Sequence, residues 1–578
     1  MLPSVAQIVF LVIVLCHLAQ SQKEPNTLVD IHDLGVVRGS TSYTARTNQC
    51  FASFYNIPYA EPTTGAKRFK PPTRIAPWTA VRDVTQPGLE CPQPDGHNQN
   101  VEDCLSLSVF TKNTNGSFPV MVYVHGGGFY RGSAAEYPPH YLLEREIVLV
   151  VLQYRLGPFG FLSTLSETIP GNAGILDIIM AVEWVRNYIA DFGGDPQMIT
   201  LFGQSAGAAA ISALLYSPLV SHYLFQQVIL QSGGSMSNWA IDSNPVANAK
   251  NIANLVGCIV DDTTLTAIEQ CLMEASTQSL VNATLPHLHN IFIDGMQDIS
   301  GMGMVVGGPS GFLLRTPLRS ARQGLMRHDV RMMGGVTKQD GSFLLNSFYD
   351  HLVTDGRFNH SMYIQFELVD TMNRIMQLDD NSGALLAFEI QTLFSESDLS
   401  SGNITQMVRG LIDIAGAIAL KGPVLRDIQA NVRISEKETY LYTFDYAGEH
   451  TRFGYGKDTS HYPFSGGVHH SDENIYLFPY PDKVANLNQA DTEISEMMLD
   501  LWTSFAIDGV PASNHTPPWQ PVHGFTGPYM HIDKPASIEQ NFYREFSATV
   551  RESSNALRYL GQFVLIVCAC LTVIFWRF

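Results

Sequence analysis

The chain has few basic residues for its length. Its 578 residues include 35 Lys and Arg against 54 Asp and Glu, so the formal net charge is −19. A protein that binds the phosphates of nucleic acid needs a basic face, and this composition therefore disfavours nucleic acid as a partner. It does not separate an enzyme from an adhesion protein, because acidity of this kind mainly serves solubility.

Long low-complexity segments and long runs of one charge are also absent. The apolar run at residues 8–16 is too short for a membrane span, which needs about 20 residues. It is followed by Ala19-Gln20-Ser21, and small residues at these positions are typical of a cleaved secretory signal. We therefore predict a signal peptide at residues 1–21, although no Lys or Arg precedes the apolar run.

A second short apolar run, residues 563–576, lies at the carboxyl end. Upstream are the small residues Ser553–Asn555 and a spacer that ends at Gln562. This order is typical of a signal for a glycosylphosphatidylinositol (GPI) anchor. The spacer also contains apolar residues that could extend a tilted transmembrane helix. We predict membrane attachment through a tail at residues 556–578, with the GPI anchor favoured over a single span, and an amphipathic tail of a soluble protein as a third possibility.

Cysteine is scarce, with eight residues in the chain. Cys16 lies in the predicted signal, and Cys568 and Cys570 lie in the tail. The body contains two close pairs, predicted to form the disulfides Cys91–Cys104 and Cys258–Cys271, which suits an oxidising compartment. Cys50 is left over and is expected to be a buried thiol. Five sequons, at Asn115, Asn282, Asn359, Asn403 and Asn514, favour a glycosylated, extracellular, cell-surface protein.

Short apolar runs that suit strands buried on both faces recur through the body. They cover residues 120–124, 147–152, 199–202, 228–230 and 440–444. Segments with helical periodicity, such as 178–189 and 492–506, lie between or after them. This alternation predicts an α/β architecture. No internal repeat or linker divides the body, so we expect one large domain at residues 22–555.

A nucleophile motif follows one of these predicted strands. Residues 199–202 lead directly into Gly203-Gln204-Ser205-Ala206-Gly207. A Gly-x-Ser-x-Gly turn between a strand and a helix exposes a serine hydroxyl in a strained backbone conformation. The helix predicted after it would direct its N-terminal N–H groups and its dipole at a developing oxyanion. Ser205 is therefore the candidate nucleophile.

A glycine-rich segment follows the strand predicted at 120–124. It reads His125-Gly126-Gly127-Gly128. Glycines allow the backbone to approach a substrate carbonyl and to direct N–H groups at its oxygen. A turn without a functional role is the alternative, but the nearby serine motif favours an oxyanion loop.

Several motifs together resemble the type-B carboxylesterase/cholinesterase family, over nearly the whole mature chain. Besides the two motifs above, the matching segments are Asn56-Ile57-Pro58-Tyr59-Ala60, Arg68-Phe69, Glu102-Asp103-Cys104-Leu105, Tyr154-Arg155-Leu156-Gly157 and Phe192-Gly193-Gly194-Asp195-Pro196. The resemblance implies an α/β-hydrolase fold, in which helices cover both faces of a mostly parallel sheet. It also implies a serine hydrolase that cleaves small-molecule carboxylic esters without a cofactor or metal.

The same resemblance assigns the remaining site residues. The family's acid precedes Gly in a Lys-x-acid-Gly segment, matched here by Asp340, and its histidine matches His470 rather than His469. The backbone N–H groups of Gly127, Gly128 and Ala206 would then hold the oxyanion. Ser232 would belong to the polar network behind the triad.

The sequence departs from the family pattern at three points. Asp340 is one methylene shorter than the Glu found in most members, so the backbone must approach His470 more closely. Gln204 replaces the Glu that often precedes the nucleophile. The segment Pro92–Asp103 between two cysteines is short and has no Trp, whereas cholinesterases stack choline on a Trp in this loop. A cholinesterase is therefore disfavoured.

Two other functions remain as alternatives. One is an adhesion protein of the cholinesterase-like type with little or no catalysis, although such a protein has no need of all three triad residues. The other is an esterase of the juvenile-hormone type, which shares Gln before the serine. That alternative is weakened because Ile178, and not Gln, follows Asp177. The sequence does not define the oligomeric state.

Overall fold

The computed structural model describes residues 25–94, 96, 101–258, 264–293, 302–345, 349, 367, 404–453, 459–460, 462, 464–479 and 486–551. The predicted signal peptide, the predicted tail and the sequons at Asn359 and Asn403 lie outside these residues. In the part of the chain that is described, no helix combines the length and apolar character needed to cross a membrane.

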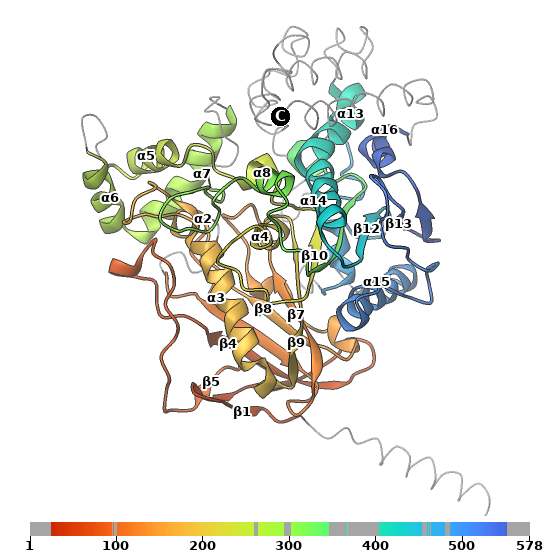
Figure 1. The fold of residues 1–578 in the computed structure, drawn as a ribbon, viewed down its shortest axis with the longest axis horizontal. Coiled ribbons are helices and arrows are strands. Elements are labelled where there is room, and N and C mark those ends of the chain that lie inside the picture. Colours follow the sequence, from red (N-terminus) through yellow and green to blue (C-terminus); the bar gives the residue numbers. More distant parts are fainter. Residues whose placement is uncertain are drawn as a thin grey trace, which may run out of the picture.

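An 11-stranded sheet forms the centre of the molecule (Figure 1). In order across the sheet, its strands are β14 (Ser537–Glu539), β13 (Tyr529–Ile532), β12 (Thr439–Phe444), β11 (Arg331–Thr337), β10 (Gln227–Gln231), β9 (Gly194–Gln204), β7 (Phe118–Val124), β8 (Val148–Leu152), β6 (Ser106–Thr111), β4 (Cys50–Pro58) and β3 (Ser40–Tyr43). Neighbouring strands from β13 to β8 are parallel, whereas the pairs at both edges are antiparallel. The predicted mostly parallel sheet is confirmed.

The central strands are buried on both faces, as their unbroken apolar sequences predict. In β7, Val120, Val122 and Val124 belong to one hydrophobic core, and Met121 and Tyr123 belong to the other. Because successive side chains of a strand point to opposite faces, each strand contributes to both cores. Because the central strands are parallel, their carboxyl ends lie at the same edge of the sheet. The residues that follow these strands therefore meet at that edge.

Helices cover the two faces of the sheet. One core includes residues of α3 (Ala173–Tyr188), α4 (Ala206–Leu214) and α14 (Gly422–Ile434), and the other includes residues of α15 (Gln489–Asp508). The other α-helices among the described residues are α2 (Gly157–Phe161), α5 (Pro245–Leu255), α6 (Leu265–Glu274), α7 (Thr277–Ile293), α8 (Pro317–Arg322), α13 (Ile404–Gly416) and α16 (Ala548–Arg551). A separate three-stranded sheet contains β1 (Leu28–Ile31), β2 (Gly35–Arg38) and β5 (Arg82–Asp83).

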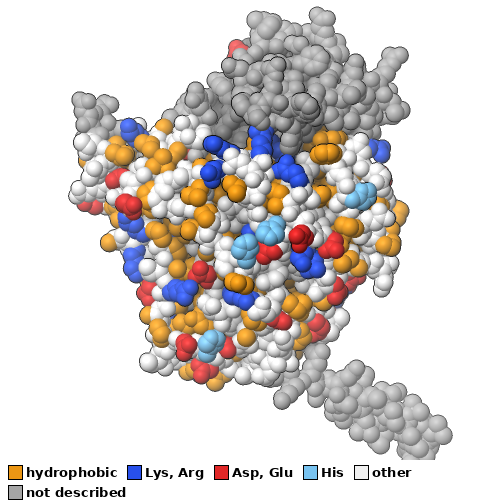
Figure 2. All heavy atoms as spheres, in the orientation of Figure 1, with side chains coloured by type: hydrophobic (Ala, Val, Ile, Leu, Met, Phe, Trp, Pro, Cys, Tyr) orange, Lys and Arg blue, Asp and Glu red, His pale blue; other side chains and the backbone are white. Residues whose placement is uncertain are grey.

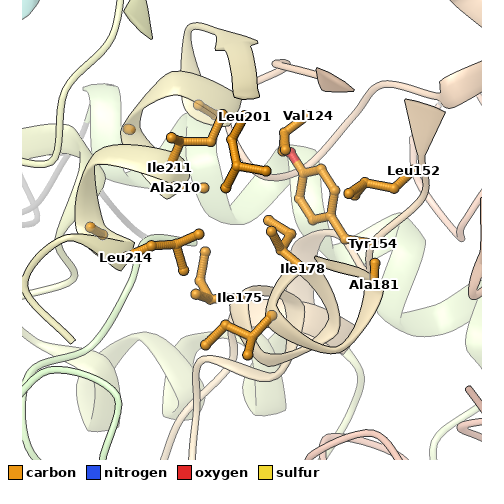
Figure 3. Close-up of a cluster of buried hydrophobic side chains, with 14 of the residues drawn as sticks. Val124, Leu152, Tyr154, Ile175, Ile178, Ala181, Leu201, Ala210, Ile211 and Leu214 are labelled. Atoms are coloured by element: carbon orange, nitrogen blue, oxygen red, sulfur yellow. The ribbon is translucent and has the colours of Figure 1, made fainter. Parts of the chain in front are cut away.

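The packing of α3 and α4 on the sheet fixes the position of the turn that carries Ser205. Figure 3 shows Ile178 of α3 and Ile211 of α4 beside Leu201 of β9. All three side chains are fully buried. Full burial of a side chain of this size contributes about 1.5–3 kcal/mol. This packing therefore anchors the end of β9 and the start of α4, between which the turn lies.

The structure contains disulfides between Cys91 and Cys104 and between Cys258 and Cys271, while Cys50 is a buried thiol. Disulfides of this kind are typical of proteins that fold in an oxidising compartment and act outside the cell. Three predicted glycosylation sites, Asn115, Asn282 and Asn514, have exposed side chains. Figure 2 shows acidic and basic side chains interspersed on the visible face.

Candidate active site

Ser205 occupies a strained turn between β9 and α4. Its backbone angles are φ 56° and ψ −123°, a conformation that residues other than glycine rarely adopt. The two glycines of the motif pack against β7, since a Cβ atom at Gly207 would lie 2.0 Å from the Val124 carbonyl oxygen and one at Gly203 would lie 2.6 Å from it. The close approach of these backbones therefore explains why the motif has glycine at both positions.

Hydrogen bonds on both sides of Ser205 hold this conformation. Its N–H donates to the Gln231 carbonyl at 2.8 Å, and its own carbonyl accepts from the Ala209 N–H at 2.9 Å. Gly233 packs against it as well, because a Cβ atom there would lie 2.1 Å from the Ser205 carbonyl oxygen. The serine is thus fixed by β10 and by the first turn of α4.

The glycine-rich loop lies directly beside Ser205. A Cβ atom built on Gly126 would be 3.0 Å from the Ser205 Cβ. The next two residues, Gly127 and Gly128, have φ angles of 111° and 61°, which glycine adopts without steric cost. Gly127 also caps a turn, because its carbonyl accepts from the N–H groups of Tyr130 and Arg131. The sequence therefore needs glycines here for conformation as well as for access.

His125 supports this loop from within the core. Its Nδ1 atom lies 2.9 Å from the Gly126 carbonyl oxygen, and its own carbonyl accepts from the Tyr154 hydroxyl at 2.9 Å. The two rings are stacked with centroids 4.6 Å apart. Burial lowers the pKa of His125 to about 4, so the side chain is neutral at physiological pH and donates from Nδ1. His125 therefore acts as a structural support.

Asp340 and His470 form a buried pair at the carboxyl ends of the strands. The Asp340 Oδ1 and His470 Nδ1 atoms are 2.6 Å apart, and the Asp340 side chain has no exposed surface. The loops that carry them are tied together. The Gln339 N–H donates to the Val468 carbonyl at 3.0 Å, and the Gln339 Oε1 accepts from the Val468 N–H at 2.8 Å. This pairing brings the backbone close enough for the shorter aspartate to reach the imidazole.

Two further side chains contact the His470 imidazole. The Phe343 ring stacks on it with centroids 4.4 Å apart. The Gln204 Nε2 atom lies 3.0 Å from the His470 Nε2 atom, and Gln204 immediately precedes Ser205. The structure therefore brings His470, Asp340 and the serine turn together.

His469 points its Nδ1 atom at the His470 carbonyl, and burial lowers its pKa to about 3, so it stays neutral.

A polar network lies beneath this pair. The Gln231 amide donates to the Asn474 Oδ1 at 3.0 Å and accepts from the Trp502 Nε1 at 3.2 Å. Glu473 is fully buried beside it. Burial, together with the nearby Asp340 charge, raises the pKa of Glu473 to about 8. Glu473 is therefore protonated at neutral pH, which avoids a second negative charge next to Asp340.

The structure adds residues that sequence reasoning did not place at the site. These are Gln339, Phe343 and Glu473, and their contacts depend on how distant loops pack. Ser232 is fully buried, and within the described residues its hydroxyl has no hydrogen-bond partner. Among those residues, no group of three His, Cys, Asp or Glu side chains is arranged to hold a metal.

Comparison with known proteins identifies the family. The model of the carboxylesterase family matches residues 25–550. The chain is 32% identical to juvenile hormone esterase of Tribolium castaneum over 512 residues, which are 85% of each chain. It is 29% identical to carboxylesterase 1E of Mus musculus over 492 residues, which are 82% of this chain and 84% of the relative.

Glutactin of Drosophila melanogaster is also similar, with 30% identity over 533 residues. These residues are 89% of this chain but 51% of glutactin, so the chain spans about half the length of that relative. Since the family model covers most of the sequence, the chain belongs to the carboxylesterase family. The predicted α/β-hydrolase fold and the predicted class of activity, hydrolysis of carboxylic esters, are confirmed.

Proposed function

We propose that the chain cleaves esters through an acyl-enzyme on Ser205, with His470 as the base and Asp340 as its partner. The observation that carries this proposal is the 2.6 Å contact between Asp340 Oδ1 and His470 Nδ1. It leaves the other ring nitrogen facing the end of β9, one residue from Ser205. A serine hydrolase requires a histidine that a carboxylate orients in this way, close to its nucleophile.

The chemistry follows from the roles of these groups. The Ser205 hydroxyl attacks the ester carbonyl while His470 takes its proton, and His470 then returns the proton to the departing alcohol. Water repeats the same steps on the acyl-enzyme and releases the acid. Asp340 accepts a hydrogen bond from the N–H group at Nδ1 of His470. This bond holds the imidazole in the reactive tautomer and stabilises the imidazolium.

The negative charge that develops on the carbonyl oxygen needs donors. The backbone N–H groups of Gly127, Gly128 and Ala206 supply them in our proposal, since the glycine loop lies against Ser205 and Ala206 begins α4. The N-terminus of a helix also favours negative charge. Each donor of this kind typically lowers the barrier by about 3 kcal/mol.

Labelling with an organophosphate probe tests the nucleophile and separates catalysis from adhesion. Wild-type protein should take up one label and lose esterase activity, whereas Ser205→Ala should do neither. The matched control is Ser221→Ala, at an exposed serine outside the site, which should label like the wild type. If the wild type hydrolyses no ester and takes no label at Ser205, the catalytic proposal fails and an adhesion function is favoured.

The substrates we propose are neutral esters. Gln204 is uncharged, and the segment between Cys91 and Cys104 has no Trp, so two features that attract choline are absent from the sequence. The similarity to juvenile hormone esterase makes its namesake hormone a second candidate substrate. A panel of neutral esters of increasing acyl length, a choline ester and juvenile hormone should give the highest kcat/KM for a neutral ester. A preference for the choline ester would contradict this.

We also propose that the protein is extracellular and attached to the cell surface by residues 556–578. The two disulfides support an oxidising compartment, and the order of small residues, spacer and apolar tail supports a GPI anchor over a span. Treatment of expressing cells with a phosphatidylinositol-specific phospholipase should release esterase activity into the medium. Retention of the activity on the cells would favour the transmembrane helix.

A further inference from the structure

The side-chain amide of Gln204 is hydrogen-bonded to the ring nitrogen of His470 that the proposed mechanism uses as the base. Its Nε2 atom lies 3.0 Å from the His470 Nε2 atom, and both side chains are buried. Within the described part of the chain, His470 Nε2 has this amide as its hydrogen-bond partner and not the Ser205 hydroxyl. The contact joins residues 266 positions apart in the sequence.

The hydrogens in this contact can be assigned from its partners. The carboxylate of Asp340 only accepts, so His470 Nδ1 carries the proton. In a neutral imidazole the Nε2 atom then has a lone pair. The amide nitrogen of Gln204 only donates, and its N–H therefore points at that lone pair. A protonated Nε2 would face a group that cannot accept its hydrogen.

The position of Gln204 is fixed by its surroundings. It is the last residue of β9 and its side chain is 3% exposed. Its Oε1 atom faces the oxyanion loop, since a Cβ atom built on Gly126 would lie 2.9 Å from it. The amide therefore bridges the space between the oxyanion loop and His470.

We infer that Gln204 is a positioning residue that keeps His470 neutral and oriented for catalysis. The inference rests on the proposed function of Ser205 and His470. A donor at Nε2 stabilises the neutral imidazole relative to the imidazolium. When substrate is bound, the Ser205 hydroxyl takes the place of the amide at the lone pair.

Other titratable groups near His470 also affect its charge. Asp340 bonds to its Nδ1 atom, and His469 is its neighbour in sequence. Glu473 and Asp472 follow on the same segment, and Arg452 donates its backbone N–H to Asp472. The variants below leave all of these unchanged, so differences among them report on Gln204.

The test compares the pH dependence of kcat/KM in variants of Gln204. Gln204→Met keeps the size of the side chain but removes the hydrogen-bond donor. The acidic limb of the profile of kcat/KM against pH should therefore move to higher pH, by roughly half a pH unit to one unit. Gln204→Glu keeps the shape and adds a charge that favours the imidazolium, so the limb should move up by about one unit or more. Gln197→Glu adds the same charge at an exposed position of β9 and should leave the limb in place.

The expected order of the acidic limbs is therefore wild type, then Gln204→Met, then Gln204→Glu. A downward shift in Gln204→Met would show that the amide oxygen faces His470 and would overturn the inference. Unchanged limbs in both variants would overturn it too. Gln204→Met decides the direction, because the charge of Gln204→Glu raises the limb whichever amide atom faces His470. If Ser205→Ala loses activity but the acidic limbs of the two Gln204 variants match the wild type, this inference alone is refuted. If Ser205→Ala keeps full activity, the proposed function is refuted.

Discussion

Phe343 covers one face of the His470 ring, with the two ring planes 24° apart and their centroids separated by 4.4 Å. Such a stacked pair contributes about 0.5–1.5 kcal/mol beyond its buried area. The contact also limits rotation of the imidazole about its side-chain bonds. Phe343 therefore supports the orientation of the base from a side that neither Asp340 nor Gln204 occupies.

Replacing Phe343 should weaken catalysis without abolishing it. We expect Phe343→Ala to lower kcat/KM about 3- to 10-fold, because the imidazole loses the stacking contact that holds it. Phe343→Tyr keeps the ring and should stay near the wild-type value. Steady-state kinetics on one neutral ester would measure both. Equal effects of the two variants would argue that the stacked ring has no role.

Removing the charge of Asp340 should be far more severe. In Asp340→Asn the amide cannot hold His470 in the reactive tautomer, and kcat should fall by about 10⁴-fold. Circular dichroism should show the fold unchanged. Asp33→Asn, at an exposed aspartate with φ 62°, is the control and should retain full activity. A loss below about 10-fold in Asp340→Asn would mean that another group orients the base.

Gly233 is expected to tolerate no side chain. A Cβ atom there would lie 2.1 Å from the Ser205 carbonyl oxygen, and its three nearest atoms all belong to the Ser205 backbone, which cannot move aside as a flexible side chain could. Gly233→Ala should lower the free energy of unfolding by roughly 1–3 kcal/mol and kcat/KM by about 100-fold, because the nucleophile turn shifts. Gly524→Ala is the control, since its Cβ would meet the Gly527 carbonyl at an ordinary 3.6 Å. Similar values for the two variants would contradict the prediction.

Glu473 makes the stability of the fold depend on pH. Its pKa is raised to about 8 in the folded protein, first by burial and then by the charge of Asp340. The folded state thus binds a proton that the unfolded chain releases near pH 4.5. Its contribution to stability is complete below that pH and is lost as the pH rises toward 8.

Glu473→Gln removes this titration. The Tm of the variant should therefore rise relative to wild type as the pH increases from 5 to 8. Thermal unfolding at a series of pH values would measure the difference, with Glu274→Gln on the exposed surface as the control. A Tm difference that stays constant over this range would show that Glu473 does not titrate there.

The middle of the sheet could be predicted from sequence, and its edges could not. Central strands such as β7 and β10 have apolar residues on both faces, so they appear as continuous runs. Strand β3 (Ser40–Tyr43) is polar and partly exposed, and β1, β2 and β5 form a small separate sheet. Short strands of this kind have no distinctive periodicity, because their pairing depends on distant segments.

The residues of the candidate site also divide into those that could be predicted from the sequence and those that could not. Ser205 and the glycine loop could be identified because strained turns and close backbone contacts restrict the residue types that fit. Asp340 and His470 were predicted from a family resemblance, since their separation along the chain has no fixed value. For Gln204 the sequence showed that a charge was missing, but only the structure shows that its amide reaches His470.

The hydrogen bonds between Gln339 and Val468 divide the candidate triad into two mechanical parts. Asp340 and His470 are carried on loops fastened to each other, whereas Ser205 lies on a turn that is anchored by β10 and α4 and is joined to His470 only through the Gln204 amide among the contacts described above. Motion within the site would thus change the distance from serine to histidine before it separated histidine from aspartate. Partial loosening of the fold should consequently switch off turnover while the acid–base pair remains assembled.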